Sequence, residues 1–395
     1  MVENCTIGYF KDGEDIFAGK NREPGKDSLD IMIIRSPYIS SAKLMYIGVN
    51  PEENICLHSE IEIANYEKRI LTLKECNINL YSLKSKQKIP KGLKGILSDN
   101  VWGGLYPDKR VGMSASAPAR PIYLLPGKDH TVIGNASHYN LERLWGGINS
   151  SGLFVQSSSI RHDNRLKNRP SYSIMINDLL EKFSDPRKAI VYLEKELRDF
   201  SPGAANFLVA NGDSQYILEF LPPDVTRSKK AEFKIRENLD MDFRTNFGLE
   251  SKFFKRADWD LSTSESEEEI HHFIRSLNRL IVAYEDCSQD IFKSHKVYPE
   301  LFDKKILQEF VNIMYNGDLK SASLIDGEDF ASFYSICTHP IVKDDLFPTY
   351  KRTFWNMFAN LTKSEVLLSY DNPCQSGAKI EISPLEIEKA IKSLS

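Results

Sequence analysis

The fold of this chain is decided near its start by residues 5–23, which read CTIGYFKDGEDIFAGKNRE. Two short apolar runs flank Asp12-Gly13, and an Asp-Gly pair between such runs is a strong β-hairpin signal. A turn centred on Asp12-Gly13 would place Cys5 opposite Lys20 in an antiparallel pair, with residues 21–23 at the same strand end. The sequence therefore predicts a thiol beside a cation, an amide and a carboxylate.

The position of Cys5 gives it a chemistry that a buried cysteine lacks. A thiol has a pKa of about 8.5, so it is mostly protonated at neutral pH, and the thiolate is the reactive form. A free α-amino group titrates at about pH 7.7–8 and can serve as a general base. If residues 1–4 were removed, Cys5 would carry nucleophile and base on one residue, and Lys20 or Arg22 would favour its thiolate. The alternative is that Cys5 is an ordinary small apolar residue of a first strand.

Composition excludes several classes of function. The chain has 395 residues with 41% hydrophobic and 27% charged residues, which is ordinary for a globular protein of one large or two medium domains. The net charge of −4 gives no support for a nucleic-acid partner. Six widely spaced cysteines without a Cys-x-x-Cys pair favour free thiols in a reducing compartment. We find no signal segment or membrane-spanning run and expect a cytoplasmic protein.

Strand and helix patterns come in separate runs along the chain. Strands are expected at 31–35, 44–47, 131–133, 153–156, 205–210, 215–220, 353–358 and 365–370. Helices are expected at 174–183, after the Ser184-Asp185-Pro186 cap, at 270–284, at 306–314 and after Ser383-Pro384. Residues 145–152 read as a turn that feeds a strand, and residues 50–145 as a region with a lid or loop insertion. Such segregated runs predict an α+β fold rather than a parallel βαβ array.

Several short motifs occur in an order that resembles one family. They are Cys5-Thr6 with its hairpin, Gly19-Lys20-Asn21-Arg22-Glu23, Asn149-Ser150-Ser151-Gly152-Leu153, the paired strands from Phe207 to Glu219, Thr245-Asn246, the stretch from Ser251 to Ala257, and Asp371-Asn372-Pro373-Cys374. This order resembles the thiol branch of the N-terminal nucleophile hydrolases. That branch includes choloylglycine hydrolases, penicillin V acylases, acyl-CoA:6-aminopenicillanate acyltransferases and secernin-like dipeptidases.

The resemblance implies a fold and a nucleophile. The fold would be a four-layer αββα sandwich, with residues 5–395 as a single domain behind a short propeptide, residues 1–4. Removal of the initiator methionine alone does not expose Cys5, so self-cleavage of the propeptide is implied. Cys5 would attack an amide carbonyl while its freed amine relays the proton. No cofactor and no metal is implied; Cys56 and His58 are a lone pair without a second pair at ligand spacing.

The resemblance also assigns supporting roles. Asn246 would donate to the tetrahedral oxyanion, Glu23 would hold the new α-ammonium group, and Arg256 would orient Glu23 or polarise the thiol. Lys20 stands where bile-salt hydrolases and acylases usually carry Arg, and it lacks the bidentate fork of Arg. Asn21 would support the site beside it. Ser159 stands where bile-salt hydrolases have an Asn that helps the oxyanion.

Three functional readings follow. The first is a hydrolase that cleaves a linear amide carbon–nitrogen bond in a small N-acyl amide or peptide, with acyl transfer as a variant of the same mechanism. The second is a non-catalytic binding or scaffold protein that keeps the fold, suggested by residues 1–4 and by the departures at Lys20 and Glu23. The third is a secernin-like dipeptidase. The expected partner is a small amide or peptide, with neither nucleic acid nor membrane, and a homo-oligomer is compatible with the resemblance.

Overall fold

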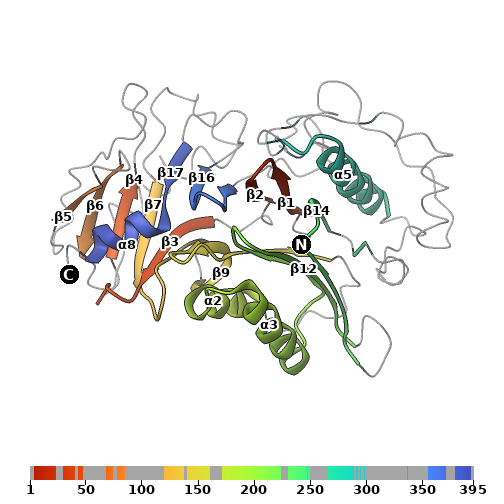
Figure 1. Cartoon of the computed structure of the whole chain (residues 1–395), viewed down its shortest axis with the longest axis horizontal. Helices are drawn as coiled ribbons and strands as arrows, with labels where there is room; N and C mark the ends of the chain where they lie inside the picture. The colour runs from red at the N-terminus through yellow and green to blue at the C-terminus, as the bar shows by residue number, and fades with distance from the viewer. Residues whose placement is uncertain are drawn as a thin grey trace.

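The structure is a computed structural model. It describes residues 4–23, 30–40, 43–47, 68–73, 78–84, 120–137, 140–160, 171–223, 230–246, 248–249, 266–288, 291, 294, 298, 336, 355–370 and 379–392. Within these residues the secondary structure is mixed, with two β-sheets and four helices (Figure 1). The chain therefore belongs to the α+β class, as the sequence predicted.

The smaller sheet contains the opening hairpin. Its six strands run in the order β14-β1-β2-β15-β16-β17 and every neighbouring pair is antiparallel. Their bounds are β1 (Asn4–Asp12), β2 (Asp15–Glu23), β14 (Met241–Arg244), β15 (Trp355–Asn360), β16 (Glu365–Tyr370) and β17 (Lys379–Ile382). Strand β1 is thus internal in this sheet, whereas β14 is an edge strand.

The larger sheet has eleven strands in the order β13-β12-β11-β10-β9-β8-β3-β7-β4-β6-β5. Strands β3 and β7 form a parallel pair, and all other neighbouring strands of this sheet are antiparallel. Its strands are β3 (Asp30–Ser36), β4 (Lys43–Ile47), β5 (Lys68–Leu73), β6 (Ile78–Lys84), β7 (Arg120–Pro126), β8 (Val132–Ser137), β9 (Asn140–Asn149), β10 (Phe154–Ser159), β11 (Ala205–Ala210), β12 (Gln215–Leu221) and β13 (Glu232–Glu237). The described part of residues 50–145 includes strands β5, β6, β7 and β8 and the first part of β9, all of this sheet.

The described helices are α2 (Ser173–Lys182), α3 (Pro186–Phe200), α5 (Ser266–Glu285) and α8 (Pro384–Lys392). Helix α3 begins where the sequence predicted, because the Asp185 carboxylate accepts hydrogen bonds from the Arg187 and Lys188 backbone nitrogens and Pro186 occupies the first turn. Among the described residues, no helix combines the length and apolar character needed to cross a membrane.

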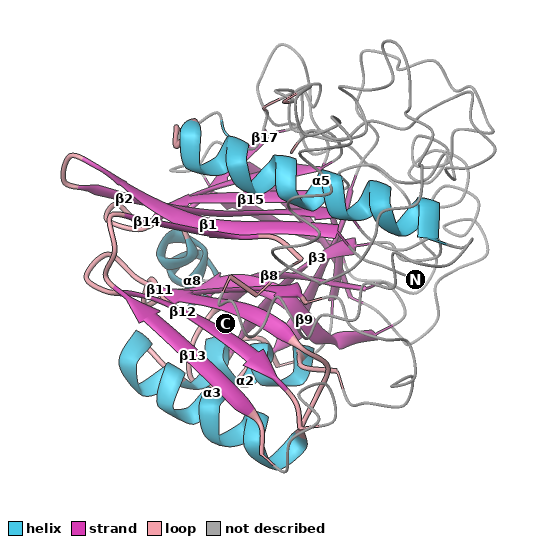
Figure 2. Ribbon diagram, turned by 90° about the vertical axis from the view of Figure 1, so that its right-hand side faces the viewer, coloured by secondary structure: helices cyan, strands magenta, loops and turns pink. Residues whose placement is uncertain are grey.

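Helices α2, α3 and α5 lie on the outer faces of the two sheets (Figure 2). Helix α5 packs on the six-stranded sheet through a cluster that includes Phe10, Phe243 and Leu280. Helices α2 and α3 pack on the eleven-stranded sheet through a cluster that includes Leu179 and Leu193. A third cluster takes apolar side chains from both sheets and lies between them, and α8 adds to it. Helices thus cover the outer face of each sheet, and an apolar cluster lies between the sheets.

The register of the opening hairpin differs from the predicted one. The two-residue turn is Gly13-Glu14, with Gly13 at φ +60°, so Asp12 pairs with Asp15 and Cys5 pairs with Arg22 instead of Lys20. Glycine at the first central position of a two-residue hairpin turn adopts a positive φ without steric cost. The turn therefore forms one residue later than Asp12-Gly13, and the partner of Cys5 moves by two residues.

The remaining expectations have mixed outcomes. The hairpin of β11 and β12, the start of α3 and the strand pair of β15 and β16 are confirmed. Residues 145–149 belong to strand β9 instead of a turn, and the turn to β10 occupies residues 150–153. The helix expected at 306–314 lies outside the described residues. Strands β5, β6, β7, β13, β14 and β17 were not predicted; β13, β14 and β17 alternate apolar and polar residues, but over only four to six residues.

Asn149 joins the turn before β10 to the end of helix α2. Its side-chain oxygen accepts from the backbone nitrogens of Ser151 and Leu153, both at 3.0 Å. Its side-chain nitrogen donates to the carbonyl oxygens of Leu180 at 2.9 Å and Phe183 at 2.6 Å. These carbonyls lie at the C-terminal end of α2, where backbone acceptors have no intrahelical donor. One buried amide therefore satisfies four backbone groups.

We expect Asn149→Asp to destabilise the fold more than Asn149→Ala. Alanine leaves four backbone groups without partners, at a cost of about 3 kcal/mol or more. Aspartate keeps the acceptor but sets a buried carboxylate oxygen against two carbonyl oxygens. Urea unfolding at neutral pH measures both variants, with Ser151→Ala as a nearby control. A stability equal to that of the wild type in Asn149→Asp would contradict this role.

Glu388 of α8 accepts hydrogen bonds that fasten this helix to the Thr131 region. Its carboxylate accepts from the Thr131 backbone nitrogen at 3.4 Å and from Lys392 Nζ at 2.7 Å. Burial acts to raise the pKa of Glu388, but hydrogen bonds from Lys392, Ser150 and Thr131 outweigh it and lower the pKa from 4.5 to about 2. The charged form is thus favoured in the folded chain.

The pKa of Glu388 predicts a pH-dependent difference between the wild type and Glu388→Gln. Because the folded-state pKa lies below the unfolded one, the carboxylate contributes stability fully above pH 4.5 and loses this contribution as the pH falls toward about 2. Urea unfolding of both proteins over this pH range should show the wild-type advantage shrinking with acidity. A difference that is constant over the range would show that the charge of Glu388 is not responsible.

Candidate active site

One end of the layer between the two sheets is polar, although the rest of that layer is apolar. Along β10, Phe154 belongs to the apolar core, while Gln156 and Ser158 lie on the same face further along the strand. We call this region the polar end. It comprises Cys5, Lys20, Arg22, Gln156, Ser158, Asn206, Glu219, Asp242 and Arg244, all buried. Buried polar groups on this scale require a dense network of partners.

Cys5 lies at the polar end as the second residue of β1. Its side chain is 3% exposed, and its neighbour across the hairpin is Arg22. Its backbone nitrogen donates to Asn246 Oδ1 at 3.2 Å across a sequence separation of 241 residues. Cys5 is therefore hydrogen-bonded to Asn246 at the edge of the sheet on one side and pairs with Arg22 of β2 on the other.

Asn246 follows β14 and connects Cys5 to the end of β10. Its Nδ2 donates to the Ser159 carbonyl oxygen at 2.9 Å and lies 3.3 Å from Ser159 Oγ. Because the Cys5 N–H is a donor, the side-chain atom that faces it has to be the amide oxygen. The structure thus brings Cys5, Asn246 and Ser159 together. It presents the oxygen of Asn246 to Cys5, whereas the expected role in oxyanion binding would present the nitrogen.

Two cations of β2 face the second sheet. Lys20 is buried, and its Nζ donates to the carbonyl oxygens of Ser157 at 2.7 Å and Trp145 at 3.3 Å. Arg22 places its guanidinium carbon 4.3 Å from the centroid of the Trp145 ring, a cation–π contact. Arg22, rather than Lys20, is therefore the cation paired with Cys5, and Lys20 fastens β2 to the strands of the other sheet.

Of the other residues expected at the site, Asn21 points away from Cys5. Asn21 donates from Nδ2 to the Ile336 carbonyl oxygen at 2.9 Å and accepts from Asn356 Nδ2 at 2.6 Å. It alternates with Lys20 and Arg22 along β2 and so lies on the opposite face of the sheet from Cys5. Glu23 ends β2, with its backbone paired to Asn4. Arg256 lies outside the described residues, as do Cys56, His58 and Cys374.

The sequence analysis missed the residues that fix Asn246. The carbonyl oxygen of Thr245 accepts from Ser158 Oγ at 2.7 Å and from Asn206 Nδ2 at 3.1 Å. Arg244 donates from Nε to Glu219 Oε1 at 2.7 Å, and its guanidinium also pairs with Asp242. Burial lowers the pKa of Arg244, against the raising effect of Glu219. The sequence did contain a signal of this network, because Gln156–Ser159 is a run of polar residues in a strand whose other residues are apolar.

The described residues hold no cluster that could bind a metal. No three side chains of His, Cys, Asp or Glu lie together within the part of the chain that the structure describes. The polar end instead combines a thiol, an amide, hydroxyl groups and paired charges. Such a set can position a nitrogen base and stabilise a thiolate.

Comparison with known proteins gives distant structural neighbours. No protein-family model and no curated protein matches the chain. Penicillin V acylase from Agrobacterium tumefaciens is 9% identical with a TM-score of 0.34, over 93% of this chain and 82% of that chain. Two variants of the conjugated bile acid hydrolase from Clostridium perfringens are each 10% identical with a TM-score of 0.33, over 96% of this chain and 92% of theirs. These neighbours are N-terminal nucleophile hydrolases. The identities and TM-scores carry no inference about chemistry, which has to come from the residues of the site.

We expect iodoacetamide to modify Cys287 well before Cys5 in protein that retains residues 1–4. Cys287 follows α5 and is exposed, whereas the Cys5 thiol is buried. Alkylation depends on access as well as on thiolate character. Peptide mass spectrometry distinguishes the two sites, and unfolded protein in urea provides the control in which both react. Equal rates in the folded protein would contradict the burial of Cys5.

Proposed function

We propose that this protein is a hydrolase of linear amide carbon–nitrogen bonds that uses Cys5 as an N-terminal nucleophile after loss of residues 1–4. The observation that carries the proposal is the 3.2 Å hydrogen bond from the Cys5 nitrogen to Asn246 Oδ1. That nitrogen becomes the α-amine when the preceding peptide bond is cut. The group proposed as the base is therefore already held before it is released.

The proposed reaction proceeds in two steps. The α-amine of Cys5 takes the thiol proton, and the thiolate attacks the amide carbonyl carbon of the substrate. The tetrahedral intermediate collapses to a thioester as the ammonium returns the proton to the leaving amine. Water, deprotonated by the same amine, then hydrolyses the thioester and regenerates the thiol. Asn246 keeps the amine in place, and Arg22 favours the thiolate through its positive charge.

The same groups support self-processing. The Cys5 thiol would attack the carbonyl carbon of Asn4, and the Cys5 nitrogen would leave as the new amine. Water would then hydrolyse the thioester and release residues 1–4. Burial of the Cys5 side chain, at 3% exposure, suits a form that is inactive before this cleavage. In the proposal, Glu23 holds the resulting ammonium group and Arg256 orients Glu23.

A non-catalytic scaffold is the second candidate, and the burial of Cys5 is the observation that favours it. A sealed thiol in a strand needs no chemistry to explain it. The hydrolase is preferred because the Asn246 contact would still hold this nitrogen once it becomes the α-amine, and because the neighbour of Cys5 across the hairpin is the cation Arg22. The proposal includes a cytoplasmic setting, a small N-acyl amide or a peptide as substrate, and a homo-oligomer as the assembled form.

Intact mass of protein purified from its native cell tests the proposal. Wild-type protein should lose the mass of residues 1–4, and Cys5→Ala should keep it, because alanine supplies no attacking sulfur. Cys287→Ser, which removes an exposed thiol, should be processed like the wild type. Intact wild-type chain that still begins at Met1 would favour the scaffold.

Processed protein then decides between substrates. We expect thiol-dependent release of amine from a panel of N-acyl amides, with loss of turnover in Cys5→Ala. Turnover restricted to dipeptides would instead support the dipeptidase, and turnover on neither class would count against catalysis.

A further inference from the structure

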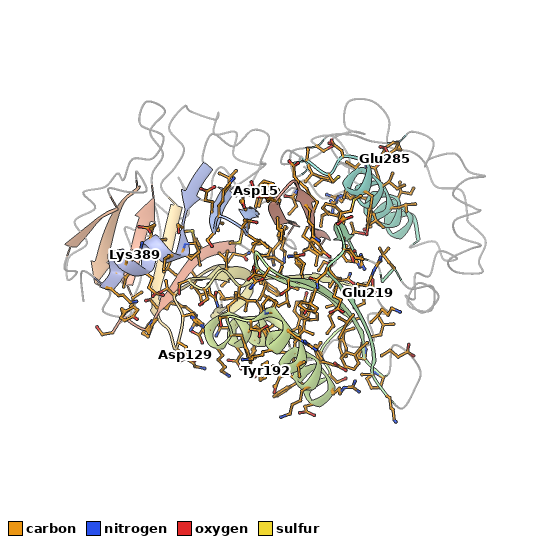
Figure 3. The ribbon with its side chains drawn as sticks, in the orientation of Figure 1. Asp15, Asp129, Tyr192, Glu219, Glu285 and Lys389 are labelled. Carbon is orange, nitrogen blue, oxygen red and sulfur yellow. The ribbon has the colours of Figure 1, made fainter. Side chains whose placement is uncertain are left out.

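Glu219 accepts hydrogen bonds from residues on both sides of Asn246 in the sequence. Its Oε1 accepts from Arg244 Nε at 2.7 Å and from the Leu249 backbone nitrogen at 2.8 Å. One donor lies two residues before Asn246 and the other three residues after it. Glu219 belongs to β12 in the other sheet, is 1% exposed, and lies in the part of the molecule between α3 and α5 (Figure 3).

Strand β14 needs such support because it is an edge strand. The backbone groups of an edge strand that point away from the sheet find no ladder partner. Here side chains satisfy them. Phe243 donates its N–H to Tyr284 Oη at 3.2 Å and accepts from Arg244 Nη1 at 2.8 Å. The Thr245 carbonyl oxygen accepts from Ser158 and Asn206 of the other sheet. The second sheet and α5 therefore help to set the position of the chain at Asn246.

The charges in this network are arranged around Arg244. Its guanidinium pairs with Glu219 and with Asp242, and all three side chains are at most 1% exposed. Loss of one partner from a buried pair leaves a charge without compensation and shifts the groups around it. Asp242 still faces Arg244 when Glu219 is removed, so the arginine retains one counter-charge. The expected effect is then a displacement of the 244–249 segment rather than expulsion of the arginine.

We propose that Glu219 is a positioning residue that holds Asn246 at hydrogen-bond distance from the Cys5 nitrogen, acting through Arg244 and the Leu249 backbone nitrogen. This inference rests on the proposed function, because Asn246 matters for chemistry only if Cys5 reacts. A displacement of about 1 Å in a positioning group costs about 100-fold in rate when the reaction depends on it. Glu219 acts through Asn246, not on the reacting atoms.

The test compares four full-length proteins with the wild type: Glu219→Ala, Glu219→Gln, Glu181→Ala and Cys5→Ala. Glutamine keeps an oxygen that can accept both hydrogen bonds, so it separates acceptor geometry from charge. Glu181 is the matched control, because it is also 1% exposed and paired with an arginine, Arg35 Nη1 at 3.3 Å, but lies on α2. Loss of residues 1–4 is followed by intact mass. Amide hydrogen exchange is measured at residue 5 and at Leu249 in versions of the wild type, Glu219→Ala and Glu181→Ala that also carry Cys5→Ala, because a processed chain has no amide at residue 5.

We expect Glu219→Ala to slow processing by about 10- to 100-fold and, in the Cys5→Ala background, to speed amide exchange at residue 5. Glu219→Gln should recover most of the processing rate. Glu181→Ala should leave processing unchanged, and in the Cys5→Ala background it should leave exchange at residue 5 unchanged, despite any fall in melting temperature. Processing in Glu219→Ala at the wild-type rate, or equal slowing in Glu181→Ala, would overturn the positioning role.

Failure of the proposed function gives a different pattern. The wild type would then keep residues 1–4, as Cys5→Ala does. Hydrogen exchange still decides the inference in that case. Faster exchange at residue 5 in Glu219→Ala, but not in Glu181→Ala, supports the link from Glu219 to the backbone nitrogen of residue 5, and unchanged exchange in both rejects it.

Discussion

The hydrogen bond between the Cys5 nitrogen and Asn246 Oδ1 is the contact on which the site depends. It joins the first described strand to a residue 241 positions later, at the edge of the same sheet. A net value of about 1 kcal/mol is typical for such a bond, so it cannot order the site by itself. Its geometry is set by the surrounding groups, which hold β14 in place from the second sheet and from α5.

Burial of the polar end costs free energy on folding, and the contacts that offset this cost fix the two sheets relative to each other. Buried polar and charged groups lose hydration, and only complete pairing offsets the loss. The sheets therefore cannot slide relative to each other at this end without breaking several contacts together, such as those of Lys20 with Ser157 and of Asn206 with Thr245. The apolar part of the same layer imposes no such directional constraint, because apolar contacts tolerate small shifts. Precision at Cys5 thus comes from the polar network, and stability comes from the apolar core.

How far the sequence could predict the site is clearest in the opening hairpin. The predicted pairing placed Lys20 opposite Cys5, and the structure has Arg22 there. Side chains alternate with a period of two, so a shift of two residues keeps the same set of side chains on the face of Cys5. The prediction that a cation of β2 shares the face of Cys5 therefore survived the error in register. The turn geometry at Gly13 decided the partner, and an Asp-Gly pair alone does not specify which of two adjacent turns forms.

The role of Asn246 could not be read from the chain, because the direction of an amide depends on its neighbours. The sequence places Asn246 near Cys5 only through a resemblance, and it gives no reason why the oxygen should face the nitrogen of Cys5. That reason is the donor character of the Cys5 N–H together with the acceptors of Ser159 on the other side. The pairing of Glu219 with Arg244 could not be predicted from the sequence either. A strand that reads QYILEFL and is buried along its whole length requires a cationic partner for its single carboxylate. The sequence contains that requirement, but only the packing of β12 against the edge strand β14 selects Arg244 as the residue that meets it.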